Sequence, residues 1–298
     1  MAKIVAIGEV LWDVFPESER LGGAPFNFSV QAARLGHDVR FVSAVGNDAR
    51  GSAILERARE LGLRTEYVRV VSGLATGMVS VRLDDAGKPD FHLHRPAAYD
   101  LVGLDAGDLD ALEEWRPDWM YYGTLHQIYP DVREVTARLM RTVAGAKKFY
   151  DLNLRPPCYS RELLEELLHA ADVVKLNDDE AVELDAMFGL RARSLDEFMA
   201  DWQERCGWEA VAVTRGAKGC AVRIGRDYAE PAGFAVQVVD TVGAGDAFAA
   251  AFLHGLGQGW DARKTGEFAN RVGAVVASRA GALLHAQRRI VDAHAAAV

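Results

Sequence analysis

Short apolar stretches of strand length alternate along the chain with longer segments in which apolar residues recur every three or four positions. The stretches that we expect to be strands are residues 3–8, 39–46, 118–123, 148–153, 172–177 and 209–214. The segments that we expect to be helices are residues 27–36, 52–62, 132–145, 161–170, 194–207 and most of 246–279, and several of them end in glycine, a common helix stop. This alternation predicts an α/β fold with a mostly parallel central sheet and helices on both faces.

Two segments interrupt the alternation. Residues 9–24 follow the first strand without an immediate helix, and residues 74–95 read as two strands around a DDAGK turn. They predict a small β lid, formed from about 9–24 and 74–97, outside the main sheet of a single domain spanning 1–298. The MVSVRL stretch (78–83) alternates apolar and polar residues, which favours a half-buried face and a homodimer that forms through the lid.

Composition narrows the class of protein. The chain has 298 residues, enough for one large α/β domain, and its net charge of −9 argues against a general nucleic-acid binder, because phosphate contacts need a basic face. No run approaches the ~18 apolar residues of a membrane span. Three scattered cysteines, Cys158, Cys206 and Cys220, favour buried free thiols in a reducing compartment. We therefore expect a cytoplasmic protein with neither nucleic-acid nor membrane partners.

The segment DTVGAGDAF (240–248) carries the strongest chemical signal. If VQVVD (236–240) ends a strand and a helix follows, Gly243, Ala244 and Gly245 form the N-terminal turn of that helix, where free N–H groups and the helix dipole attract an anion. Asp246 would then be placed to take a proton from a hydroxyl that attacks phosphorus. A plain helix cap is the alternative, but it would not need both glycines. The sequence contains no GxxxxGK[ST] loop, no dinucleotide fingerprint and no protein-kinase motif set.

DTVGAGDAF resembles the C-terminal signature of the ribokinase-like (PfkB) carbohydrate kinases. Further segments resemble that family in the same order, and bacterial fructokinases in particular: GEVLWDVFP with LGGAPFNFSVQAARLG, YDLNLRPP, KLNDDE and VTRGAKGC. The resemblance implies a ribokinase-like fold and an ATP- and Mg²⁺-dependent sugar kinase, with fructose converted to fructose 6-phosphate. Kinases of 2-keto-3-deoxygluconate, ribose or a nucleoside remain alternatives within the family. A regulator that binds sugar or nucleotide without catalysis is an alternative from another class.

The resemblance also implies roles for individual residues. Asp246 is the expected base, with Gly243, Ala244 and Gly245 as the anion hole. The residues expected to bind the sugar are Asp13, Gly22, Gly23, Asn27, Arg95, Asn153 and Arg155. Those expected on the nucleotide side are Asn177, Glu180, Thr214, Arg215, Gly216, Gly219 and Asn270, with Glu180 reaching Mg²⁺ through water. A K⁺ site is implied at Asp240, Val242 and Gly281, although its loop ends in GALLH rather than a small hydroxyl residue.

Several of these residues have a purely structural alternative. Asn27 and Asn177 could each cap the helix that follows, and Asn177 could do so while keeping a functional role. Arg155 could be a surface charge, but a negative protein must supply cations at a phosphate-transfer site. His92 and His94 alternate on one strand face without a third ligand, which argues against a metal site. Phe26 and Phe28 are larger than the residues usual beside this asparagine in the family, and could reshape the sugar pocket.

Overall fold

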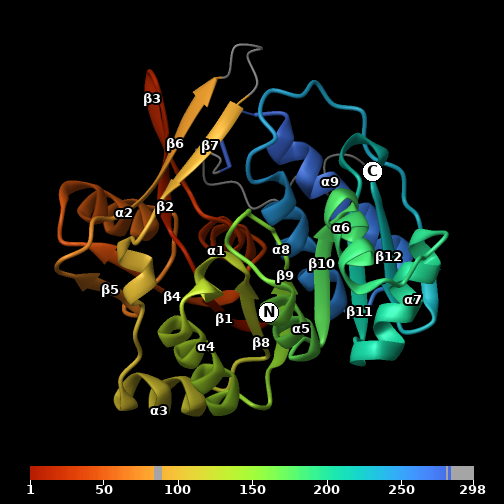
Figure 1. Cartoon of the computed structure of the whole chain (residues 1–298), viewed down its shortest axis with the longest axis horizontal. Coiled ribbons are helices and arrows are strands. Elements are labelled where there is room, and N and C mark those ends of the chain that lie inside the picture. The colour runs from red at the N-terminus through yellow and green to blue at the C-terminus, as the bar shows by residue number, and fades with distance from the viewer. Residues whose placement is uncertain (84–88, 280, 283–298) are drawn as a thin grey trace.

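The computed structural model describes residues 1–83, 89–279 and 281–282. Within these residues the largest element is a nine-stranded sheet in the order β13-β12-β11-β10-β9-β8-β1-β4-β5 (Figure 1). The seven neighbouring strands β11, β10, β9, β8, β1, β4 and β5 are parallel to one another. Strand β12 is antiparallel to β11, and β13 is antiparallel to β12. The bounds are β1 Lys3–Ile7, β4 Asp38–Gly46, β5 Val68–Val71, β8 Trp119–Gly123, β9 Lys147–Asp151, β10 Val173–Asn177, β11 Ala210–Thr214, β12 Cys220–Ile224 and β13 Asp227–Ala229.

Helices cover both faces of this sheet. One face carries α1 (Ala24–Arg34), α2 (Ala49–Glu60), α8 (Ala244–Gly257) and α9 (Ala262–Ala277). The other carries α3 (Ala106–Trp115), α4 (Pro130–Thr142), α5 (Arg161–His169), α6 (Asp178–Phe188) and α7 (Leu195–Cys206). Three short 3₁₀ turns complete the connections: η1 Ala98–Leu101, η2 Leu125–Ile128 and η3 Gly216–Lys218.

The two-sided burial follows from the period of a strand. Alternate residues of β1 point to opposite faces, so Ile4 and Ala6 join the core under α1 and α8, while Val5 and Ile7 join the core under α4 and α5. A strand buried on both faces reads as a continuous apolar run, which is why these strands are visible in the sequence. The expected fold class is confirmed.

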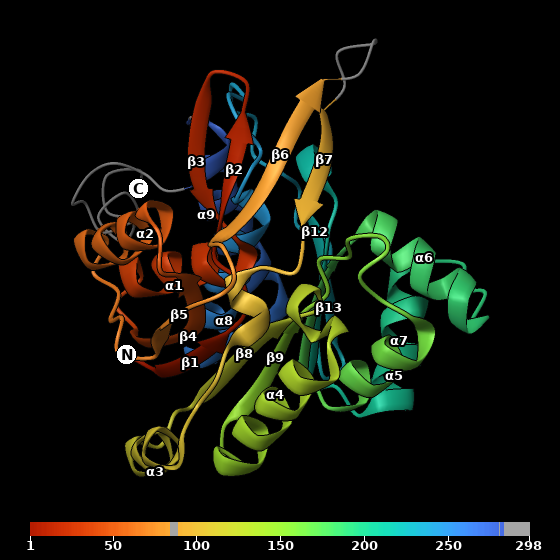
Figure 2. The ribbon, with the colours of Figure 1, turned by 60° about the vertical axis from the view of Figure 1, so that its left-hand side comes forward.

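A second sheet of four strands, in the order β3-β2-β6-β7, projects away from the main sheet (Figure 2). Its bounds are β2 Leu11–Phe15, β3 Ser18–Gly22, β6 Gly77–Leu83 and β7 Pro89–His94. It begins directly after β1, so its base adjoins the carboxyl end of a central strand. The expected DDAGK turn at 84–88 lies outside the described residues.

The structure departs from the expected elements in a few places. The segment 236–240 is not a strand: the N–H groups of Val239 and Asp240 both donate to the carbonyl of Ala277 at the end of α9, so they do not join a sheet. The first helix begins at Ala24 rather than at residue 27, with Gly23 as its N-cap. Strands β5, β12 and β13 and helix α3 were not anticipated. Among the described residues, no helix has both the length and the apolar character that crossing a membrane requires.

Candidate active site

The DTVGAGDAF segment forms the expected turn at the start of a helix. Gly243 is the N-cap of α8 and has φ 78°, a left-handed conformation that favours glycine. A Cβ at this position would lie 2.2 Å from Cβ of Ala282, so close packing also requires a glycine. The turn therefore places the first N–H groups of α8 where an anion can approach, at the positive end of the helix dipole.

Asp246 lies in the first turn of α8 and is held from α1. The side-chain amide of Asn27 donates to Oδ2 of Asp246 at 2.8 Å. Burial raises the pKa of Asp246 to about 6, and the nearby Asp151 carboxylate raises it as well, whereas Lys175, Asn27 and Arg155 act against the shift. A carboxylate with this pKa can accept a proton near neutral pH. Asn27 is not a helix cap, because it lies in the second turn of α1.

A buried lysine adds a positive charge beside the turn. Nζ of Lys175, on β10, pairs with Oδ1 of Asp151 at 2.9 Å, and the hydroxyl of Tyr121 donates to Oδ2 of Asp151 at 3.0 Å. A methyl group at Gly245 would lie 3.4 Å from this Nζ. Although burial opposes the charge, the carboxylates of Asp151, Glu180 and Asp246 raise the pKa of Lys175. Sequence reasoning missed Lys175; the available signal was a single charge within the apolar run VVKLN.

The expected sugar-binding residues Asp13, Gly22 and Gly23 lie together at the base of the small sheet. Burial raises the pKa of Asp13 to about 6, with Arg155 and Arg20 opposing the shift. A Cβ at Gly22 would lie 2.6 Å from Oδ2 of Asp13, and a Cβ at Gly23 would lie 2.6 Å from the carbonyl oxygen of Glu9. Gly22 is therefore needed for close packing against Asp13, and Gly23 for close packing against the backbone of Glu9.

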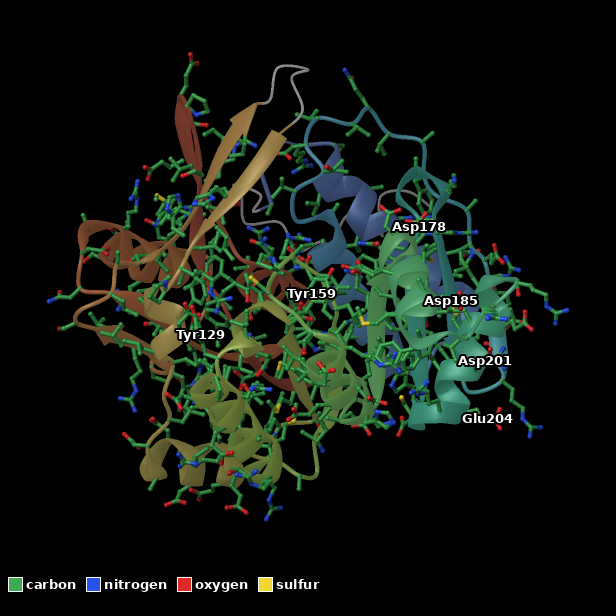
Figure 3. The ribbon with its side chains drawn as sticks, in the orientation of Figure 1. Tyr129, Tyr159, Asp178, Asp185, Asp201 and Glu204 are labelled. Atoms are coloured by element: carbon green, nitrogen blue, oxygen red, sulfur yellow. The ribbon has the colours of Figure 1, made fainter. Side chains whose placement is uncertain are left out.

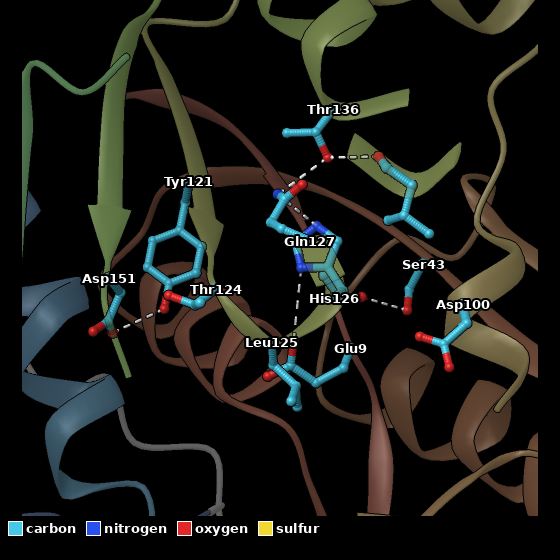
Figure 4. A network of polar contacts seen from close by, with 12 residues as sticks. Glu9, Ser43, Asp100, Tyr121, Thr124, Leu125, His126, Gln127, Thr136 and Asp151 are labelled. Carbon is cyan, nitrogen blue, oxygen red and sulfur yellow. Dashed lines mark hydrogen bonds and ion pairs between the residues drawn. The ribbon is translucent and has the colours of Figure 1, made fainter. Parts of the chain in front are cut away.

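A second buried acid, Glu9, follows β1 in the same region (Figure 4). Its side chain is 4% exposed, and its Oε2 lies 3.9 Å from Nδ1 of His126. Within the described part of the chain, neither of these two atoms has a hydrogen-bond partner. Burial raises the pKa of Glu9 to about 7, and Asp246 adds to the shift. Sequence reasoning did not single out Glu9, although a charged residue directly after a buried strand was a usable signal.

The three remaining residues expected near the sugar are placed differently. The Arg95 guanidinium is bound to the Asp100 carboxylate and donates to the carbonyl of Leu125 at 2.7 Å, so it supports the base of the small sheet. A direct contact between Arg95 and a sugar stays a prediction. Asn153 adopts φ 44° just after β9. Arg155 is exposed, forms no ion pair within the described residues, and opposes the pKa shifts of Asp13, Glu9 and Asp246.

Asn177 and Glu180 form a reciprocal cap at the start of α6. Asn177 Oδ1 accepts from the N–H of Glu180 at 2.8 Å, and Glu180 Oε2 accepts from the N–H of Asn177 at 2.8 Å. Glu180 Oε1 accepts from the N–H of Leu154, also at 2.8 Å. Because each oxygen already accepts an N–H, one lone pair remains on each, which suits a Mg²⁺ contact through water better than direct ligation. Asn177 is therefore a helix cap, as its structural alternative predicted, and the Mg²⁺ contact of Glu180 through water stays a prediction.

The expected nucleotide-side residues gather where β11, β12 and α9 meet. Gly219 has φ 93°, and a Cβ there would lie 2.2 Å from the carbonyl oxygen of Pro231. The side-chain amide of Asn270 donates to the carbonyls of Pro231 and Ala232 at 3.1 and 3.2 Å, so it fixes the same loop from α9. The other members of the group are Thr214 at the end of β11, Arg215, which pairs with Glu230, and Gly216 in η3.

The expected K⁺ residues surround a carboxylate that already has three partners. Asp240 accepts from the N–H groups of Val242 and Gly281, both at 3.0 Å, and pairs with the Arg20 guanidinium. No cluster of three metal-ligating side chains occurs in the part of the chain that the structure describes. The rings of His92 and His94 pack against each other, and Nε2 of His94 is hydrogen-bonded to the hydroxyl of Ser80 at 2.6 Å. The three cysteines are free.

Charge is distributed unevenly over the molecule. Many acidic residues of α6 and α7 point outward, including Asp178, Asp185, Asp201 and Glu204 (Figure 3). The cations Lys175 and Arg155 instead adjoin the carboxyl ends of β10 and β9. In an open parallel sheet, ligands bind outside the carboxyl ends of the strands. The turn at Gly243, Asp246, Asp13 and Lys175 therefore define the candidate active site.

This combination of fold and site is that of a phosphate-transferring α/β enzyme, and comparisons with known proteins define the family. The model of the pfkB family of carbohydrate kinases matches residues 1–288. The chain therefore belongs to the pfkB family of carbohydrate kinases.

Individual relatives agree with this assignment. The chain is 31% identical over 273 residues to a fructokinase of Salmonella typhimurium, covering 86% of this chain and 84% of the relative. The crystal structure of a fructokinase with bound ATP from Xylella fastidiosa superposes with a TM-score of 0.83 at 28% identity, covering 94% of this chain and 93% of that one. An E. coli ribokinase II crystallised with ATP and Mg²⁺ shares the fold, with a TM-score of 0.84 at 24% identity over 99% and 98% of the two chains.

Proposed function

We propose that this protein is an ATP-dependent sugar kinase that phosphorylates the 6-hydroxyl of fructose. The observation that carries the proposal is Asp246 at the start of α8, held by Asn27 beside the Gly243–Gly245 turn and Lys175. In this proposal Asp246 is the proton acceptor, the N–H groups of the turn bind the transferred phosphoryl group, and Lys175 supplies a buried cation beside them. The fructokinase relatives and the ATP-bound fructokinase structure support the choice of both substrates.

The chemical step needs few protein groups. Asp246 takes the proton of the attacking hydroxyl as its oxygen bonds to the γ-phosphorus, and the bond between the γ-phosphorus and the bridging oxygen breaks to release ADP. The N–H groups of the turn and the Lys175 ammonium stabilise the negative charge that develops on the transferred phosphoryl group. Mg²⁺, which would be held through water by Glu180, would supply further neutralisation of the phosphate charge when bound.

The charges on the acceptor side favour a neutral sugar. Three carboxyl groups, those of Glu9, Asp13 and Asp246, are buried or half-buried there, and each has a raised pKa because of burial. They can bond to several hydroxyl groups, whereas a sugar acid would bring a further negative charge among them. Arg155 is the observation that favours the alternative acceptor, 2-keto-3-deoxygluconate, because its guanidinium is exposed near the same carboxyl groups.

A substrate panel tests the proposal. ADP release would be measured with fructose, tagatose, ribose, glucose, adenosine and 2-keto-3-deoxygluconate, and the phosphorylated position would be assigned by NMR. We expect fructose to have the highest kcat/KM and the phosphate to be on the 6-oxygen. A higher kcat/KM for the sugar acid, abolished by Arg155→Ala, would assign the protein to the alternative substrate. No ADP release with any acceptor would support a regulator.

A further inference from the structure

Arg20 and Asp240 form an ion pair between two parts of the fold that are far apart in sequence. Arg20 lies on β3 of the small sheet, and Asp240 begins the segment that leads into the Gly243 turn. The Asp240 side chain is 12% exposed and the Arg20 side chain 40% exposed. The guanidinium also lies over the ring of Phe15, 4.8 Å from its centroid. Both side chains are therefore anchored, unlike those of most surface ion pairs.

The carboxylate of Asp240 organises the segment before the anion-binding turn. Its Oδ1 accepts from the N–H of Val242 and its Oδ2 from the N–H of Gly281, each at 3.0 Å. Ala282, the residue after Gly281, packs closely against Gly243: a Cβ on residue 243 would lie 2.2 Å from Cβ of Ala282. Asp240 thus connects the segment before the turn, at Val242, with the segment after α9, at Gly281. Arg20 neutralises the charge of the Asp240 carboxylate.

Arg20 also faces the acceptor side. In the antiparallel β2–β3 ladder Arg20 is directly opposite Asp13, so the two side chains lie on the same face of the small sheet. Arg20 opposes the rise in the pKa of Asp13, and Asp240 adds to that rise. One guanidinium is therefore close both to the expected sugar-binding carboxylate and to the segment that shapes the phosphate-binding turn.

Among the residues that the structure describes, those at Asp240 do not fit a bound potassium ion. Three donors, two N–H groups and a guanidinium, already point at the carboxylate, and a second cation within a few ångströms of the Arg20 charge would be repelled. We propose that Arg20 is a built-in cation that takes the place of a monovalent metal ion at Asp240, making the enzyme independent of K⁺ and linking the position of the small sheet to the anion-binding turn. Arg20 is thus a positioning residue, because it acts through Asp240.

The test compares monovalent cations at constant chloride concentration. Rates and thermal unfolding of the wild type, Arg20→Met and Arg20→Lys would be measured in K⁺, Na⁺ and tetramethylammonium. We expect the wild-type kcat to vary less than about twofold, and Arg20→Met to lose about tenfold or more of its kcat without K⁺ and to recover much of it with K⁺. Arg20→Lys should behave like the wild type. Arg50→Met is the matched control, because Arg50 pairs with Glu19 of the same strand.

Thermal unfolding keeps the inference testable whichever acceptor is correct. The rate measurement rests on the proposed function, whereas the midpoint temperature of thermal unfolding does not, because it requires no substrate. Added K⁺ should raise the midpoint of Arg20→Met by about 2 °C or more relative to tetramethylammonium, and should leave that of the wild type unchanged. A wild-type enzyme that K⁺ activates several-fold would overturn the inference. So would a folded Arg20→Met that is fully active in every salt, or whose activity and midpoint do not respond to K⁺.

Discussion

At the scale of single residues, the site combines ionisable groups whose pKa values are shifted by burial and by one another's charges. Burial raises the pKa values of Asp246 and Asp13 to about 6 and that of Glu9 to about 7, while three carboxylates keep Lys175 charged in spite of its burial. Such shifts concentrate at functional sites, because catalysis needs proton acceptors near the working pH. Burial and Asp151 raise the pKa of Asp246, whereas Lys175 and the hydrogen bond from Asn27 favour the charged carboxylate.

The pH profile of the reaction should therefore depend on Asn27. A base with a pKa of about 6 predicts that kcat/KM falls as the pH drops below 6, because Asp246 becomes protonated. Replacing Asn27 with alanine removes the donor, so the pKa of Asp246 should rise and the acidic limb should move up by about one pH unit. Ser29→Ala, in the same helix, is the control. An acidic limb that is unchanged in Asn27→Ala would contradict this role for Asn27.

At the scale of elements, the strands and helices that could be predicted are those whose own residues show the apolar pattern of the faces that they bury. The strands β1, β8 and β10 and the helices α5 and α7 have apolar patterns that reflect their own two faces. The segment 236–240 has a strand-like pattern, but its N–H groups bond to Ala277 in α9, and no local rule reveals that partner. Lys175 and Glu9 each have a local signal in the sequence, but their partners, like the partner of Arg20, depend on which segments become neighbours in the fold.

Two histidines, His37, which is buried, and His254, which is half-buried, join the α1–β4 connection to the end of α8. Nδ1 of His37 accepts from the N–H of Ala2 at 3.1 Å, and its Nε2 lies 3.1 Å from Nδ1 of His254. Burial lowers the pKa of His37 to about 4, and it lowers that of His254 too. At these two histidines the folded state therefore binds fewer protons than the unfolded chain between about pH 4 and 6.5.

The stability that these neutral histidines contribute should fall as the pH drops through this window, whereas the raised pKa values of Glu9, Asp13 and Asp246 act in the opposite direction. His37 should contribute about 1–3 kcal/mol to the loss of unfolding free energy, and buried His126, with a pKa lowered to about 3, should act in the same direction. In urea unfolding at several pH values, the free energy of unfolding of the wild type relative to that of His37→Gln should fall as the pH drops from 6.5 to 4. The exposed His169→Gln should change nothing. An identical pH dependence in His37→Gln and the wild type would contradict this account.

At the scale of the whole molecule, the candidate site takes its residues from both the main sheet with its helices and the small sheet. Lys175 lies on β10 of the main sheet, and the Gly243 turn and Asp246 lie on α8, which packs on one face of that sheet, while the small sheet carries Asp13 and Arg20. The acceptor would bind where the two sheets meet, so that closure of the small sheet would exclude water during transfer. A homodimer that forms through this sheet stays a prediction. The DTVGAGDAF turn could be predicted from sequence because its glycines and aspartates are contiguous, whereas the meeting of the two sheets is a property of the fold.

The measurement that tests the central claim most directly is phosphoryl transfer by Asp246→Asn. This substitution keeps the shape of the side chain but removes the proton acceptor. We expect kcat to fall by about 10²–10⁴, with ATP binding, measured by calorimetry, and thermal stability both retained. A folded Asp246→Asn enzyme with nearly the wild-type kcat would contradict the assignment of Asp246 as the base.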